Sequence, residues 1–303
     1  MKIVFMGTPE FARKSLKQLY CDGHDIAGVF TQEDKPGNRG MKVSFSPVKE
    51  LAVSKGTAVY QPASLKDGKA AQILRSIDFD LIAVVAYGKI LPKEILDIPS
   101  LGCINIHGSL LPKYRGAAPI QHSILNGEKE TGVTSMYISE EMDAGDMLLF
   151  KRTSIGEDET SLDLYERLSV LGAGLLGETV EAISLGTVVR IPQNNDEATY
   201  APKLSKDMSP IDWSKSAYEI KCKVRGLFPW PCATMKLGEN TVKVHTVEIS
   251  DSNKGKTPGC LLSCGERGPE IACKDGSVFI REVQAPGGKR MDTTDYLRGN
   301  PIK

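Results

Sequence analysis

One short stretch of the chain brings several chemically useful side chains together. Residues 102–116 begin as an apolar strand and continue as a loop containing an amide, an imidazole, a hydroxyl and a guanidinium. Asn105 and His107 are two residues apart, so on an extended chain both leave the same face, while the two flanking isoleucines point into a buried layer. An amide donor beside an imidazole can stabilise the oxyanion that forms during acyl transfer. The alternative interpretation is a capped strand end whose histidine only satisfies backbone groups.

A resemblance to a known family rests on this stretch and on an acidic turn further along. Asn105-Ile106-His107, Ser109-Leu110-Leu111-Pro112 and Tyr114-Arg115-Gly116 resemble the signature of folate-dependent formyltransferases, and Met142-Asp143-Ala144-Gly145-Asp146 stands where that family has its Asp-x-Gly segment. These enzymes move a formyl group from 10-formyltetrahydrofolate to an amine. The resemblance therefore implies three catalytic residues, Asn105, His107 and Asp143. Asp146 is interpreted as structural.

The same resemblance implies a folate pocket at the ends of two strands. Ligands of open α/β sheets bind at the carboxyl ends of the strands, where loops leave the sheet. We expect the folate to contact Ser109, Leu110, Leu111 and Pro112 after one strand and Tyr87, Gly88 and Ile90 after the apolar strand at 79–85. For the second loop, an ordinary strand-to-helix connection is the alternative.

Composition narrows the class of protein. A chain of 303 residues, with 41% hydrophobic and 25% charged residues, is typical of a globular protein with two domains. It has no apolar run long enough to span a membrane, and its first residues do not resemble a signal peptide, so we expect a cytoplasmic protein. The seven cysteines are scattered without a metal-ligand spacing, which predicts no structural metal.

The order of apolar segments predicts an α/β fold. Strands alternate with helices up to about residue 188, which favours a Rossmann-like, mostly parallel sheet. The first strand is followed by Gly7 alone, where a dinucleotide fingerprint needs three glycines, so NAD binding is not expected. A linker is predicted at 189–207. Short alternating strands at 208–303 then predict a small antiparallel domain, which the resemblance implies is an OB-like β-barrel that binds tRNA.

A basic, glycine-containing segment at 33–49 predicts contact with a polyanion. It contains Lys35, Arg39, Lys42 and Lys49, and it resembles the insertion found in family members that formylate methionyl-tRNA. The implied partner is initiator methionyl-tRNA, with predicted contacts at Arg39, Lys42 and Lys206. Residues 203–303 also carry 17 Lys and Arg against 12 Asp and Glu. An exposed surface connection is the alternative for this segment.

The predicted activity is formyl transfer from 10-formyltetrahydrofolate to the amino group of methionine on initiator methionyl-tRNA. No NAD, metal, membrane or obligate protein partner is expected. Two alternatives remain open. One is a formyltransferase or formyl-folate hydrolase with a small-molecule acceptor, such as a sugar nucleotide. The other is a non-catalytic nucleotide-binding regulator on a Rossmann-like core. For the second half of the chain taken by itself, a packing or dimerisation domain is the alternative.

Overall fold

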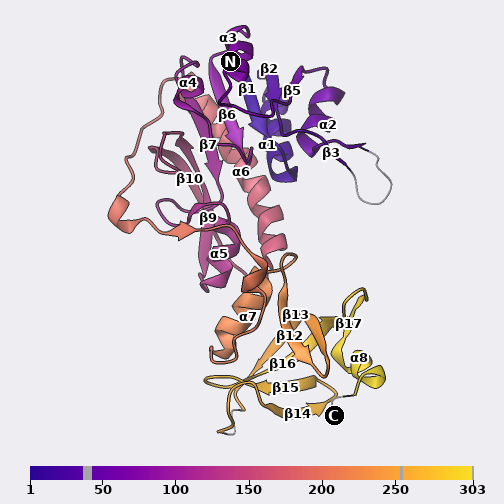
Figure 1. Ribbon diagram of the computed structural model, residues 1–303. Helices are drawn as coiled ribbons and strands as arrows, with labels where there is room; N and C mark the ends of the chain where they lie inside the picture. Colours follow the sequence, from indigo (N-terminus) through magenta and orange to yellow (C-terminus); the bar gives the residue numbers. More distant parts are fainter. Residues whose placement is uncertain (37–42, 253–254, 302–303) are drawn as a thin grey trace. The chain divides into compact units, whose positions relative to one another are not determined.

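The computed structural model describes residues 1–36, 43–252 and 255–301 (Figure 1). The chain forms two compact units. The first contains Met1–Pro119, Thr131–Thr153 and Tyr165–Ala201, and the second contains Ile120–Glu130, Ser154–Leu164 and Pro202–Lys303. The predicted boundaries at 188 and 207 stay a prediction, but two segments that precede residue 188 group with the C-terminal residues.

A seven-stranded sheet forms the centre of the first unit, in the order β10-β9-β7-β6-β1-β2-β5. Its strands are β1 Lys2–Gly7, β2 Asp25–Phe30, β5 Val59–Tyr60, β6 Leu81–Val85, β7 Cys103–His107, β9 Glu130–Tyr137 and β10 Met147–Ser154. The five strands from β5 to β7 pair in parallel, whereas β9 is antiparallel to β7. This arrangement confirms the predicted mostly parallel sheet.

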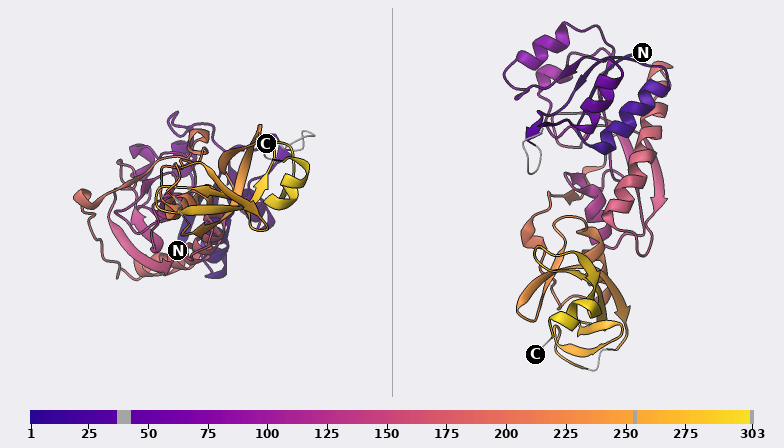
Figure 2. Two further views of the ribbon diagram at one scale, coloured as in Figure 1. Left: turned by 90° about the horizontal axis from the view of Figure 1, so that it is seen from below. Right: turned by 90° about the vertical axis from the view of Figure 1, so that its right-hand side faces the viewer.

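Helices cover both faces of this sheet, because β6 is apolar throughout and β1 is buried from Ile3 onward, so both strands need cover on two sides. The helices of the first unit are α1 Glu10–Cys21, α2 Pro47–Ser54, α3 Lys69–Arg75, α4 Lys93–Leu96 and most of α6 Ser161–Ser184. Helix α5 Pro119–Leu125 groups with the second unit from Ile120 onward. On one face, α1 and α6 run side by side, with the rings of Phe11 and Tyr165 5.3 Å apart (Figure 2). On the other face, α3 and α4 contribute Leu74 and Ile95 to a core that contains Ile82 and Val84.

Two short strand pairs lie in loops and are separate from the seven-stranded sheet. Lys35–Pro36 (β3) pairs with Val43–Ser44 (β4), and both lie within the segment 33–49 that is predicted to contact a polyanion. Arg115–Gly116 (β8) pairs in parallel with Tyr200–Ala201 (β11), so the segment predicted as a linker adds a strand to the loop that follows β7. Within that segment lies a short 3-10 helix, η1 Asn195–Glu197.

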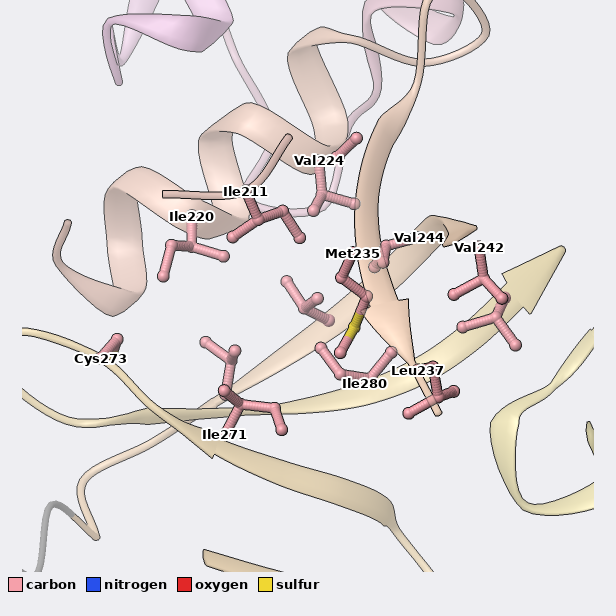
Figure 3. Close-up of a cluster of buried hydrophobic side chains, with 14 of the residues drawn as sticks. Ile211, Ile220, Val224, Met235, Leu237, Val242, Val244, Ile271, Cys273 and Ile280 are labelled. Atoms are coloured by element: carbon pink, nitrogen blue, oxygen red, sulfur yellow. The ribbon is translucent and has the colours of Figure 1, made fainter. Parts of the chain in front are cut away.

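The second unit contains a six-stranded antiparallel sheet, in the order β12-β13-β16-β15-β14 with β17 paired to β16. Its elements are η2 Lys206–Met208, α7 Ala217–Gly226, β12 Ala233–Leu237, β13 Asn240–Ser250, β14 Leu261–Gly265, β15 Gly268–Ala272, β16 Ser277–Gln284, β17 Arg290–Asp292 and α8 Thr293–Gly299. Helix α7 begins with a capping box between Ser216 and Glu219. It packs Ile220 and Val224 against strand residues such as Ile280 (Figure 3).

The predicted fold class is therefore confirmed, an α/β unit with a mostly parallel sheet and a small antiparallel unit. The sequence patterns did not predict β17 and α8, nor the pairing of β8 with β11. Within the described ranges, none of the helices combines the length and the apolar character that crossing a membrane requires.

Candidate active site

Strand β7 places Asn105 and His107 on one face of the sheet. Ile104 and Ile106 lie on the opposite face and are buried, with Ile106 close to Gly172 of α6. Asn105 is half-buried, and its side-chain amide has no hydrogen-bond partner among the described residues. Because an amide can donate two hydrogen bonds, Asn105 retains donors for a ligand oxygen.

The orientation of the His107 ring follows from its two neighbours. The residue is 5% exposed, and its Nε2 lies 2.8 Å from the carbonyl oxygen of Tyr114. Since a carbonyl can only accept, Nε2 carries a proton and donates it. The other nitrogen, Nδ1, lies 3.7 Å from Oδ2 of Asp143. Nδ1 is thus the ring nitrogen that faces the carboxylate and is available for proton transfer.

Asp143 occupies a tight turn between β9 and β10. Its φ angle is +51°, a left-handed conformation that Asp tolerates better than most residues. Its Oδ2 accepts a hydrogen bond of 2.8 Å from the backbone N–H of Gly116, and its side chain is 18% exposed. A Cβ at Gly145 would lie 1.8 Å from the carbonyl oxygen of Tyr137, so only glycine fits there. Asp146 forms an ion pair with Arg190.

The loop after β7 is anchored to strand β9. The hydroxyl of Thr134 donates to the carbonyl of Ser109 at 2.7 Å and accepts from the N–H of Leu111 at 3.2 Å. The Ser109 hydroxyl is buried and donates to the carbonyl of Lys113 at 2.6 Å. Leu111 is also buried. Leu110 and Pro112 are half-buried.

The second predicted folate loop follows β6. The Tyr87 side chain lies in the core, where burial raises the pKa of its hydroxyl to about 12. Its backbone carbonyl accepts hydrogen bonds from the side chains of Gln32 at 2.9 Å and Thr8 at 3.3 Å. Gly88 is exposed, and Ile90 is 70% exposed. An exposed isoleucine beside these strand ends provides apolar surface for a ligand.

Three polar residues at this site were not predicted as functional. Arg115 is 1% exposed, and its Nε and Nη2 donate to Oε1 of Gln193 at 3.0 and 2.9 Å. Nη2 also donates to Oδ1 of Asn195 at 2.8 Å. Gln193 and Asn195 belong to the segment predicted as a linker. The one signal for them in the sequence is the run of three amides that follows Pro192.

Three basic residues were predicted to contact tRNA. Arg39 and Lys42 lie outside the described residues, and Lys206 is exposed at the start of η2. Lys49 was one of the basic residues in the same predicted surface. It is instead largely buried, where it pairs with Asp34, bonds Oε1 of Gln61 at 2.8 Å and lies 4.0 Å from the Phe45 ring centroid. The Lys49 ammonium, together with Gln61, lowers the pKa of Asp34.

Comparison with known families now defines the class of protein. The family model described as formyl transferase matches residues 1–180, and the one described as the formyl transferase C-terminal domain matches residues 203–301. The chain belongs to the formyl transferase family. This confirms the resemblance found in the sequence.

Full-length relatives narrow the class further. A methionyl-tRNA formyltransferase from Alkaliphilus oremlandii is 46% identical over 303 residues, which cover 100% of this chain and 98% of that protein. Another, from Caldanaerobacter subterraneus subsp. tengcongensis, is 46% identical over 304 residues, with coverage of 100% and 98%.

Solved structures share the fold. An N-formyltransferase from Helicobacter canadensis, in complex with folinic acid and dTDP-3-aminofucose, superposes with a TM-score of 0.69 at 20% identity, covering 96% of this chain and all of that one. HypX from Aquifex aeolicus, in complex with tetrahydrofolic acid, gives a TM-score of 0.64 at 19% identity over 100% of this chain and 48% of that one. At these identities the likeness concerns the fold.

Proposed function

We propose that this protein transfers the formyl group of 10-formyltetrahydrofolate to the α-amino group of methionine on initiator methionyl-tRNA. The observation that supports the proposal best is the 46% identity to methionyl-tRNA formyltransferases along the whole chain. The geometry agrees with it, because Asn105, His107 and Asp143 lie together at the end of a sheet strand. With this substrate, the protein would act in the cytoplasm.

The reaction has defined requirements for charge and protons. The amine lone pair attacks the formyl carbon, and the carbonyl electrons move to oxygen to form a tetrahedral oxyanion. The bond from carbon to folate N10 then breaks, N10 gains a proton and the amine loses one. Binding, positioning and two or three polar groups are sufficient for this chemistry, with the folate supplying the one-carbon unit. The proposed cycle involves neither a metal nor NAD.

Each of the three residues has a separate part in this cycle. Asn105 donates its unoccupied amide hydrogens to the oxyanion. His107 acts through Nδ1, because Nε2 is already bonded to Tyr114. Asp143 balances the charge of a protonated imidazole and accepts the proton of the attacking amine, directly or through water. Of the predicted folate contacts, Gly88, Ile90, Leu110 and Pro112 have exposed or half-buried surface for a ligand. Ser109, Leu111 and Tyr87 are buried, so they contribute chiefly by shaping the two loops.

A single assay with alternative acceptors tests the proposal. The protein is incubated with 10-formyltetrahydrofolate and initiator methionyl-tRNA, and both tetrahydrofolate release and formyl-methionine on the tRNA are measured. Parallel reactions contain a dTDP-amino sugar, or no acceptor. We expect tetrahydrofolate and formyl-methionyl-tRNA in equal amounts, and only in the reaction that contains the tRNA. Release of tetrahydrofolate without an acceptor would indicate a hydrolase, and formylation of the sugar nucleotide would indicate a small-molecule formyltransferase.

A further inference from the structure

We infer that Gln193 is a positioning residue for the proposed formyl transfer. Its side-chain amide holds the turn at Asp143 so that the carboxylate faces His107. The predicted effect of Gln193 on turnover rests on the proposed function. Its predicted effect on the structure of the turn rests only on its own hydrogen bonds. It also gives the segment around residue 193 a role in the active site rather than that of a passive connection.

The amide of Gln193 uses its full hydrogen-bonding capacity. Nε2 donates to the carbonyl oxygens of Asp143 and Gly145, at 2.8 Å each. Oε1 accepts from Nε and Nη2 of Arg115. A side-chain amide offers two hydrogens and two lone pairs, so every one of them is occupied here. One side chain thereby joins the loop after β7 to the turn after β9.

The chemistry of the partners fixes which way the amide points. A guanidinium can only donate, and the two backbone carbonyls can only accept. Rotating the amide by half a turn would place its N–H₂ against the guanidinium and its oxygen against both carbonyls. The observed orientation is therefore the one that satisfies all the groups. Arg115 is also held by Asn195, whose Oδ1 accepts from Nη2, and by its own backbone N–H, which donates to the carbonyl of Thr199 at 2.8 Å.

The turn needs such support because of its conformation. A non-glycine residue in the left-handed region costs about 1 kcal/mol or more relative to ordinary backbone. Asp143 adopts this conformation, and its Oδ2 then lies 2.8 Å from the Gly116 nitrogen and 3.7 Å from Nδ1 of His107. Relaxation of the turn by about 1 Å would be enough to impair proton transfer between these groups.

Two substitutions distinguish the hydrogen bonds of Gln193 to Arg115 from its hydrogen bonds to the turn at Asp143. Gln193→Met keeps the length of the side chain and loses all four hydrogen bonds. Gln193→Glu keeps oxygen acceptors for Arg115 but faces the carbonyls of Asp143 and Gly145 with another acceptor. We expect both variants to lose about 10- to 100-fold in kcat, with little change in KM for either substrate. If Gln193 only anchored Arg115, the Glu variant would keep wild-type kcat, and this result would overturn the inference.

A second measurement does not depend on catalysis. The N–H of Gly116 donates to the Asp143 carboxylate, so its hydrogen exchange reports where that carboxylate lies. We expect exchange at Gly116 to be at least about tenfold faster in both Gln193 variants than in the wild type. Unchanged exchange in both would refute the positioning role, even if turnover were lower. Absence of formyl transfer by the wild type would instead refute the proposed function and leave this measurement valid.

Asn194 provides a matched control in the next position. Its side chain is exposed, accepts from the N–H of Asp196 at 3.1 Å and donates to Glu197 at 3.1 Å, within its own turn. Asn194→Ala should therefore leave both kcat and exchange at Gly116 unchanged. Thermal unfolding of every variant establishes that it is folded. The Glu variant retains the Arg115 contact and is expected to fold even if the Met variant does not.

Discussion

At the scale of single residues, the candidate site consists of a donor, a proton carrier and a carboxylate with different surroundings. Asn105 keeps its amide unoccupied, His107 uses one ring nitrogen for the backbone, and Asp143 bonds one backbone N–H. Nδ1 of His107 lies 3.7 Å from Oδ2 of Asp143, which is too far for a direct hydrogen bond between the two groups. The candidate site therefore keeps polar groups that the protein's own hydrogen bonds do not fully use.

We expect His107→Ala and Asp143→Ala each to lower kcat by about 10²- to 10³-fold, since each removes a group that stabilises charge in the transition state. Single-turnover formylation of methionyl-tRNA gives the rate, and circular dichroism confirms that the fold is intact. Glu141→Ala is the control, because Glu141 is an exposed acid near the same turn. Near-normal turnover of either variant would remove that residue from the mechanism.

A second residue-scale prediction concerns stability in the C-terminal unit. Glu270 is buried and accepts hydrogen bonds from the hydroxyls of Ser252, Ser277 and Ser263. Burial by itself raises the pKa of the carboxyl, but these hydroxyls outweigh that effect and lower the pKa to about 2. Because the folded pKa lies below the ordinary value of 4.5, its stabilisation is present above about pH 4.5 and lost as the pH falls toward 2.

Glu270→Gln should accordingly lower the free energy of unfolding near pH 7 by about 2 kcal/mol. The variant should also lose less stability than the wild type between pH 5 and about pH 2. Denaturant titrations at several pH values measure both effects. Glu239→Gln, at an exposed position, should behave like the wild type at every pH. A wild-type pH dependence in the Glu270 variant would show that another group is responsible.

At the scale of elements, the turn between β9 and β10 depends on a glycine. A Cβ at position 145 would overlap the carbonyl oxygen of Tyr137 at 1.8 Å, so Gly145→Ala must displace the turn that presents Asp143. We expect a fall of about 10²-fold in kcat and a loss of about 2 kcal/mol in unfolding free energy. Steady-state kinetics and thermal unfolding measure these two changes.

Gly174→Ala on helix α6 is the matched control. A Cβ there would meet only Nζ of Lys151, at 3.9 Å, so no displacement is required. Alanine favours a helix over glycine, and the variant should gain about 0.5–1 kcal/mol in stability with unchanged kcat. Equal losses of kcat in the two variants would contradict the explanation by a local clash.

At the scale of the whole molecule, the chain has no net charge, but the residues from 203 onward have an excess of basic side chains. Binding of a polyanion through Lys and Arg releases counterions, so its affinity falls with salt. We expect KM for initiator methionyl-tRNA to rise steeply with salt concentration, while KM for 10-formyltetrahydrofolate changes little. A tRNA KM that is independent of salt would rule out a basic contact surface.

Single variants test which residues belong to that surface. Arg39→Ala and Lys206→Ala should each raise KM for the tRNA and lower the slope of its logarithm against log salt by about one unit. Lys17→Ala on α1 is the control and should leave the slope unchanged. Lys49 is not expected to contribute to this surface, because its ion pair with Asp34 gives it a structural role.

The sequence alone determined the parts of the site that depend on local periodicity. A spacing of two residues placed Asn105 and His107 on one face of β7, and continuous apolar runs predicted a parallel sheet buried on both sides. The motif around Asp143 and the full-length resemblance predicted the family, which the comparisons confirmed. The strand features can be predicted from sequence because the alternation of side chains along a strand depends only on residue spacing.

Tertiary structure alone decided the contacts between distant segments. Arg115 and Gln193 are 78 positions apart, and nothing in a polar segment after Pro192 indicates that it adds a strand beside the loop after β7. In the same way, the pairing of Lys49 with Asp34 converted an apparent surface charge into a structural one. Hydrogen bonds and ion pairs of this kind depend on where folding brings each side chain, and composition does not encode that position.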